Sequence, residues 1–74
     1  MTIQEILKKE SGLYGATVDG QEAVIGRDVG KGFTISLQEK PGWYRINHYN
    51  EQGELEYTDF KRDKEVAEYE RPHR

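Results

Sequence analysis

The segment from Gly32 to Phe60 contains two turn signals separated by seven residues, and it constrains the fold more than any other part of the chain. Apolar and polar residues alternate from Phe33 to Gln38, which is typical of a strand with one buried face. Pro41 and Gly42 then suit the two central positions of a tight turn. Residues 43–49 are rich in the aromatic side chains that favour a pleated surface. Two antiparallel strands are therefore expected here.

A second turn and a third strand complete this meander. Residues 50–53 (Asn-Glu-Gln-Gly) have the composition of a hairpin loop. Residues 54–58 alternate cleanly, so Leu55 and Tyr57 are predicted to face one side of the sheet, with Glu54 and Glu56 on the other.

A separate β-hairpin is predicted between Leu13 and Gly26, because Asp19 and Gly20 form one of the strongest short-range hairpin signals. A two-residue loop sets the pairing of the two strands. The predicted pairs are Val18 with Gln21, Ala16 with Ala23, and Tyr14 with Ile25. Five of these six residues are apolar and all six share one face, so the register agrees with the hydrophobic pattern.

Helices are predicted at both ends of the chain. Thr2 and Glu5 have the spacing of a capping box, and the apolar residues of the following two turns share one face, so a short helix should end at Ser11-Gly12. A second, acidic helix is predicted from about Phe60 to Tyr69, and residues 71–74 form a tail because proline cannot continue the helix.

The expected fold is α+β, with a single domain over residues 1–70. A short N-terminal helix and the acidic C-terminal helix would pack on one face of an antiparallel sheet of about five strands. A small open barrel built from the same strands is the alternative. Which face of the sheet is covered does not follow from the sequence.

Composition predicts a small domain of modest stability. Leu, Ile, Val and Phe together number fifteen of the 74 residues, so the core is small and self-association as a weak homodimer would help it. The absence of cysteine excludes disulfides, thiolate zinc sites and thiol nucleophiles. No signal peptide or membrane-spanning run is visible, so a cytoplasmic location with no membrane partner is expected.

The charge of the chain is uneven. Its net charge is −3, yet residues 51–70 alone carry eight acidic side chains against three basic ones. Such a segment repels phosphates and favours basic protein surfaces. A solvated acidic face that keeps a small domain soluble explains the same pattern equally well.

Candidate catalytic residues are few. His48 lies within a predicted strand and could act as a general base oriented by a carboxylate. No serine or cysteine nucleophile accompanies it in a recognisable motif, so a structural histidine is the better interpretation. One usable histidine and scattered carboxylates do not form a metal site, and no cofactor or small-molecule substrate is expected.

The most informative cluster is aromatic. Trp43, Arg45 and Tyr49 share one face of their strand, while Tyr44, Ile46 and His48 share the other. If a helix covers the Ile46 face, the first set forms an aromatic–arginine surface of the kind found at interaction hot spots. Alternatively, Trp43 folds over the sheet edge and completes the core.

The sequence favours a non-enzymatic protein-binding module, an acidic inhibitor or regulator that docks on a basic, nucleic-acid-handling protein. In size and charge the chain resembles the small phage-encoded inhibitors of host defence, such as anti-CRISPR and antirestriction proteins, and that resemblance implies a basic effector as the partner. The expected partner-binding residues are Trp43, Arg45, Tyr49, Glu54, Glu56, Asp63, Glu65 and Glu68.

Two alternatives remain open. One is a small nucleic-acid-binding module with an aromatic and basic surface, which would use Trp43, Tyr49, Arg45, Lys31 and Arg27. The other is an enzyme or accessory subunit built around His48, which requires a pocket at that residue. Convergence of the three basic residues on Trp43 would favour the first alternative, and a concave site around His48 would favour the second.

Overall fold

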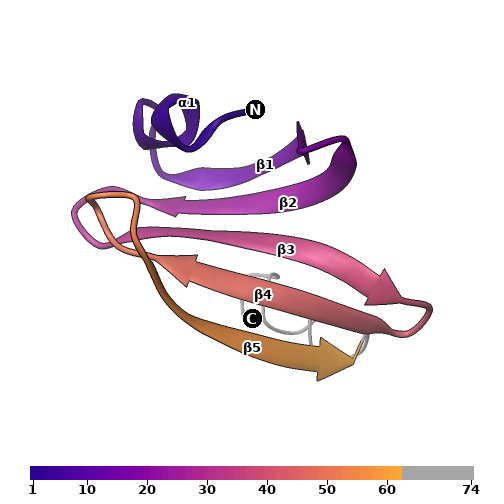
Figure 1. Ribbon diagram of the computed structural model, residues 1–74. Coiled ribbons are helices and arrows are strands. Elements are labelled where there is room, and N and C mark those ends of the chain that lie inside the picture. Colours follow the sequence, from indigo (N-terminus) through magenta and orange to yellow (C-terminus); the bar gives the residue numbers. More distant parts are fainter. Residues whose placement is uncertain (63–74) are drawn as a thin grey trace, which may run out of the picture.

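The structure, a computed structural model, describes residues 1–62 of the chain. These residues form one helix and five strands: α1 (Ile3–Leu7), β1 (Gly12–Val18), β2 (Gln21–Asp28), β3 (Gly32–Lys40), β4 (Trp43–Tyr49) and β5 (Leu55–Arg62). The strands lie in the order in which they occur in the sequence, all antiparallel, and α1 lies at the β1–β2 end of the sheet (Figure 1). The α+β prediction is confirmed for this part of the chain. Strands β1 and β5 lie at the two edges of the sheet and do not pair with each other, so the five strands do not close into a complete barrel.

The first hairpin has the predicted register. Val18 pairs with Gln21, Ala16 with Ala23, and Tyr14 with Ile25. Asp19 and Gly20 both have positive φ angles, 49° and 80°, as a tight two-residue hairpin loop requires. The apolar side chains of this hairpin therefore face one side of the sheet together.

Helix α1 is held by the predicted capping box. The Glu5 amide donates to Thr2 Oγ1 at 3.2 Å, and the Thr2 amide donates to Glu5 Oε1 at 2.9 Å. The helix ends at Leu7, earlier than Ser11-Gly12, and Gly12 instead begins β1. A helix this short forms only because its apolar face packs against the sheet.

The core lies between α1 and one face of the sheet. Its buried residues are Ile6, Ala23, Ile25, Phe33, Ile35 and Leu37. Helix α1 packs against β2 and β3. The strands β4 and β5 therefore extend beyond the area that the helix covers, so on this face of the sheet their side chains are not covered by α1.

The prediction for the end of the meander was wrong in two respects. Strand β5 continues to Arg62, so residues 60–62, assigned to the start of a helix, are strand; the rest of the predicted acidic helix lies outside the described residues. Leu55 pairs with Tyr49 and Tyr57 pairs with the adjacent His48, with an irregularity between the pairs. Such a bulge adds a residue to one strand, so Leu55 and Tyr57 face opposite sides of the sheet.

A buried arginine joins three segments at one end of the sheet. Arg27 is only 5% exposed, and its guanidinium donates to the carbonyl of Leu7 at the end of α1 and to the carbonyl of Gly32 at the start of β3. It also makes two hydrogen bonds, at 2.9 and 3.1 Å, with the two carboxylate oxygens of Glu51 in the β4–β5 turn. Glu51 in turn accepts from the Gly30 amide. We call this group the Arg27–Glu51 clamp.

The clamp shifts the pKa values of both of its charged groups. The hydrogen bond to Glu51 raises the pKa of Arg27, and the same bond, together with the Gly30 amide, lowers the pKa of Glu51. Because the folded-state pKa of Glu51 lies below its ordinary value of about 4.3, its contribution to stability is complete above that pH. The contribution is lost as the pH falls through the lowered value.

We predict that Glu51→Gln lowers the melting temperature at neutral pH, because it leaves a buried guanidinium without its counter-charge. The difference from the unaltered protein should shrink as the pH falls below the ordinary glutamate pKa of about 4.3 and towards the lowered pKa of Glu51, where this carboxyl becomes protonated in the folded protein as well. Thermal melts followed by circular dichroism between pH 3 and 7 check this. Glu22→Gln, an exposed site on β2, is the matched control. A constant difference across this range would contradict the role of the clamp.

A second prediction concerns Gly32. Its φ is +124°, and a Cβ atom built on it would lie 2.0 Å from the carbonyl oxygen of Tyr49. Gly32→Ala should therefore cost about 3 kcal/mol or more, since strain and a backbone clash add. Gly30→Ala shares the unfavourable φ, +92°, but meets no atom within 4 Å. It should cost only about 1 kcal/mol, and chemical denaturation of the two variants measures the difference.

Candidate functional site

An uncovered half of the sheet face carries the predicted aromatic cluster. Strand β4 places Trp43, Arg45 and Tyr49 on the same face as α1, since Arg45 pairs with the buried Leu37 and Tyr49 with the buried Phe33. The short helix packs on β2 and β3, and Trp43 remains 39% exposed. Among the described residues, the helix α1 thus lies on the same face as Trp43 and not on the Ile46 face. Trp43 remains exposed because α1 is short.

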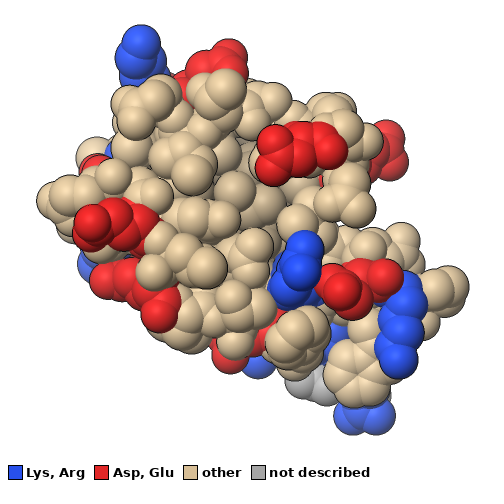
Figure 2. All heavy atoms as spheres, in the orientation of Figure 1, with Lys and Arg blue, Asp and Glu red and all other residues tan. Residues whose placement is uncertain are grey.

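Phe60 belongs to the same surface. It pairs with Arg45 across β4 and β5 and is 59% exposed. We define the aromatic–arginine surface as Trp43, Arg45 and Phe60. Figure 2 shows one face of the molecule, on which uncharged side chains form a continuous area at the left and centre, and basic and acidic side chains lie side by side at the lower right.

Arg45 is positioned but remains accessible. Its Nε lies 3.4 Å from Glu39 Oε2, and both side chains are roughly two-fifths exposed (38% and 43%). An ion pair between groups this exposed contributes little to stability, on the order of 0–1 kcal/mol. The guanidinium can therefore exchange Glu39 for a ligand at small cost.

Tyr49 contributes mainly to the core. Its ring stacks on Phe33 with centroids 4.7 Å apart and planes inclined by 8°. It also packs against the buried cluster beneath α1. Of the three aromatic and arginine residues predicted from the sequence, Trp43 and Arg45 are the two that the structure presents at the surface.

The acidic residues lie at the other end of the β4–β5 hairpin. Glu54 is exposed and accepts a hydrogen bond from Asn50 at 3.1 Å. Glu56 sits at the bulge and lines a hollow on the opposite face. Trp43 and Tyr49 mark the two ends of β4, about 20 Å apart at roughly 3.3 Å per residue. Asp63, Glu65 and Glu68 lie outside the described residues.

The basic residues proposed for nucleic-acid binding do not converge. Arg27 is buried in the clamp and Lys31 lies in the loop beside it, at the opposite end of the sheet from Trp43. Lys40, paired with Trp43, and Lys61, one residue beyond Phe60, lie closer to the aromatic–arginine surface than either of them. The set of Trp43, Tyr49, Arg45, Lys31 and Arg27 is therefore not a single site.

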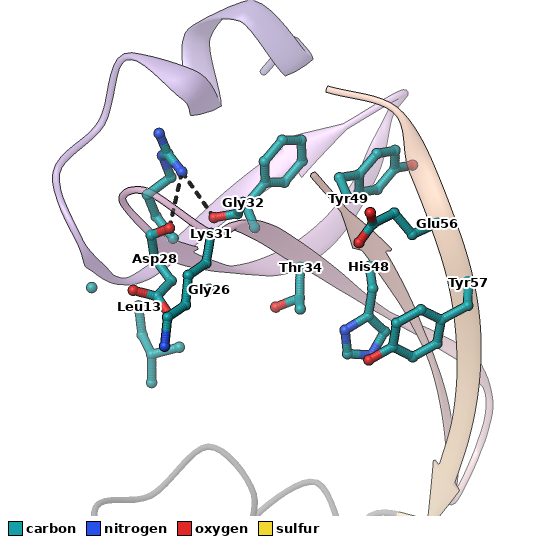
Figure 3. Close-up of a pocket in the computed structure, with 13 residues that line it drawn as sticks. Leu13, Gly26, Asp28, Lys31, Gly32, Thr34, His48, Tyr49, Glu56 and Tyr57 are labelled. Carbon is teal, nitrogen blue, oxygen red and sulfur yellow. Dashed lines mark hydrogen bonds between the residues drawn. The ribbon is translucent and has the colours of Figure 1, made fainter. Parts of the chain in front are cut away.

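The face opposite α1 contains an open hollow of about 600 Å³. Its floor is a row of residues paired successively across the sheet. The row consists of Leu13, Gly26, Thr34, His48 and Tyr57. In Figure 3 the side chains of Lys31 and Leu13 lie on one side of the hollow, and the rings of His48 and Tyr57 on the other. Position 26 has no room for a side chain, because a Cβ atom built on Gly26 would lie 2.7 Å from Thr34 Oγ1.

His48 is held by two neighbours in this hollow. Its Nε2 lies 3.0 Å from Asp59 Oδ2, and its ring stacks on Tyr57 with centroids 4.2 Å apart. A carboxylate bonded to one ring nitrogen fixes the tautomer and ring orientation, as a general base requires. The hollow is concave around His48, as the enzyme hypothesis demands, but its lining residues include neither serine nor cysteine.

Residues 1–62 contain neither a cluster of side chains that could hold a metal ion nor a membrane-spanning helix. In that part of the chain, no three His, Asp or Glu side chains come together in a way that could hold a metal ion. The helix there is too short to cross a membrane.

Sequence reasoning missed Phe60 and Asp59 as surface residues of a strand. Both were placed at the start of a helix. The apolar residues Leu55, Tyr57 and Phe60 do not keep a period of two, so alternation in the sequence gives no signal that extends the strand to Arg62.

Comparisons with protein-family models, with curated proteins and with solved structures found no match to this chain.

The exposure of Trp43 can be tested directly, because it is the only tryptophan. Because the ring is 39% exposed, we predict an emission that iodide quenches in part, and a Trp43→Ala variant that loses about 1–2 kcal/mol, well below the roughly 3–5 kcal/mol typical of a fully buried tryptophan. Ile25→Val, a change in the core, should cost about 1 kcal/mol and serves as the reference. A loss of about 3 kcal/mol or more for Trp43→Ala would place this ring in the core instead.

Proposed function

We propose that this protein is a non-enzymatic protein-binding module that acts as an inhibitor or regulator of a basic, nucleic-acid-handling protein. The observation that carries the proposal is the half-covered sheet. A sheet face in which Trp43 and Phe60 flank an accessible arginine has the composition of an interaction hot spot, where aromatic and arginine side chains supply most of the binding energy.

The acidic end of the same hairpin supports a basic partner. Glu51 is occupied by Arg27, whereas Glu54 and Glu56 are exposed near the β4–β5 turn. A standard protein interface buries about 800 Å² on each partner. An area of that size can include both ends of a hairpin about 20 Å long. Complementary charge at one end would speed association and fix the orientation of the docked partner.

We predict that tagged protein recovers a protein partner from host lysate after nuclease treatment, and that higher salt weakens the recovery. Glu54→Lys with Glu56→Lys should abolish recovery, and Trp43→Ala should reduce it. Glu10→Lys with Glu22→Lys makes the same charge change at exposed positions away from the hairpin and should have no effect. Quantitative mass spectrometry of the recovered proteins compares these variants.

Equal recovery by the variant that carries lysines at 54 and 56 would contradict the acidic docking surface. Loss of the partner from both double variants would show only that net charge matters.

A second candidate is a module that binds single-stranded nucleic acid. The specific observation in its favour is that Lys40 and Arg62 both pair with Trp43, so an aromatic ring and basic groups occur together at this end of the hairpin. Bases stack on such rings with little sequence preference, and cations contact the backbone. Quenching of Trp43 fluorescence by a short oligonucleotide, reversed by salt, would favour this candidate over protein docking.

A further inference from the structure

Strand β5 presents an edge with no pairing partner among residues 1–62. It pairs with β4 on one side and ends the sheet on the other (Figure 1). Six of its eight residues are exposed. An edge of this kind directs N–H and C=O groups outward and is a template for pairing with another strand.

The opposite edge differs. The ammonium group of Met1 donates to the carbonyl of Thr17 in β1, and the Met1 side chain packs against the core. In a two-residue hairpin the residues next to the loop bond to each other, so the carbonyl of Thr17, one position further, points away from β2. The N-terminus thus occupies part of the β1 edge, and β5 is the edge available for strand addition.

We propose that two copies of this chain pair through β5, antiparallel, about a twofold axis at Phe60, to form one continuous sheet. Such pairing keeps each side chain on its own face of the sheet. Phe60 meets Phe60 of the second copy on the α1 face. On the other face, Asp59 meets Lys61 of the second copy, and Lys61 meets its Asp59. The strand is therefore self-complementary in shape and in charge.

The neighbouring registers lack this complementarity. An axis at Asp59 places two aspartates opposite each other, and an axis at Lys61 places two lysines opposite each other. Like charges directly opposite destabilise a strand pair. An axis at Thr58 sets Glu56 against Phe60 and Leu55 against Lys61. The axis at Phe60 alone gives two opposite-charge pairs and one aromatic pair.

The contacts within one copy are compatible with this arrangement. Asp59 directs Oδ2 to His48, but a carboxylate has acceptor capacity left for an ammonium group. Helix α1 lies over β2 and β3, so it does not obstruct a strand added along β5. The pairing would also join two aromatic–arginine surfaces into one wider surface. The pairing shares Phe60 with the aromatic–arginine surface, but it involves neither Trp43 nor the glutamates at 54 and 56, so the variants that test the proposed function leave the paired residues unchanged.

A charge-exchange experiment tests the pairing. Alone, Asp59→Lys places lysines opposite each other, and alone, Lys61→Asp places aspartates opposite each other. Each variant should raise the dimer dissociation constant about tenfold or more in sedimentation velocity. An equimolar mixture of the two restores both opposite-charge pairs, so native mass spectrometry should show the heterodimer as the main dimer. Lys31→Asp, at the opposite end of the sheet, is the control and should dimerise as the unaltered protein does.

Asp59→Lys also removes the hydrogen bond between Asp59 and His48, so a second pair of variants leaves Asp59 unchanged. Phe60→Lys and Phe60→Glu alter a side chain that is already 59% exposed, so both should fold. Each alone sets like charges on the axis and should be monomeric, whereas the mixture should form the heterodimer. An unaltered protein that stays monomeric at every concentration would overturn the proposal. The proposal would also be overturned if neither mixture of variants formed a heterodimer, or if the chain associated with other proteins but never with itself.

Discussion

The arrangement of the sheet depends on how one buried cation is neutralised. Arg27 lies in β2 beneath the end of α1, where an unpaired guanidinium would be costly. Glu51 supplies the counter-charge from a turn 24 residues further along the chain, and the carbonyls of Leu7, Asp28 and Gly32 accept further hydrogen bonds from the guanidinium. The end of the helix, the β2–β3 loop and the β4–β5 turn are thereby fixed together. This joint positions the β4–β5 hairpin that carries the candidate surfaces.

Local signals predicted most of the fold. The Asp19-Gly20 loop determines the register of the first hairpin, and Thr2 with Glu5 determines where the helix begins. These features depend on residues close together in sequence, for which turn and capping rules are sufficient. The bulge near Glu56 was missed, because an extra residue in one strand is defined only by its pairing with the other. One missed bulge reversed the predicted face of Tyr57.

The candidate site was less predictable, because it depends on contacts between distant segments. Nothing local in the sequence distinguishes Arg27, a buried structural cation, from Lys31, an exposed one, and both were therefore assigned to a nucleic-acid surface. The alternation in β4 did place Trp43, Arg45 and Tyr49 on one face. It could not show that α1 is short enough to cover Tyr49 partly and leave Trp43 exposed, since coverage is a property of how elements pack.

A small apolar core and a short helix explain both why the sheet forms and why it is left incomplete. Six buried side chains from α1, β2 and β3 form one compact cluster, and no second set of comparable size lies over β4 and β5 on that face within residues 1–62. The outer hairpin is held by its backbone ladder, its turn and the Arg27–Glu51 clamp; β4 buries Ile46 completely, whereas most side chains of β5 are exposed. Trp43 and Phe60 are still partly exposed. Covering them with another surface would therefore stabilise this hairpin more than it would stabilise a strand that is already buried. The proposed association, with a second copy or with another protein, would bury this exposed surface.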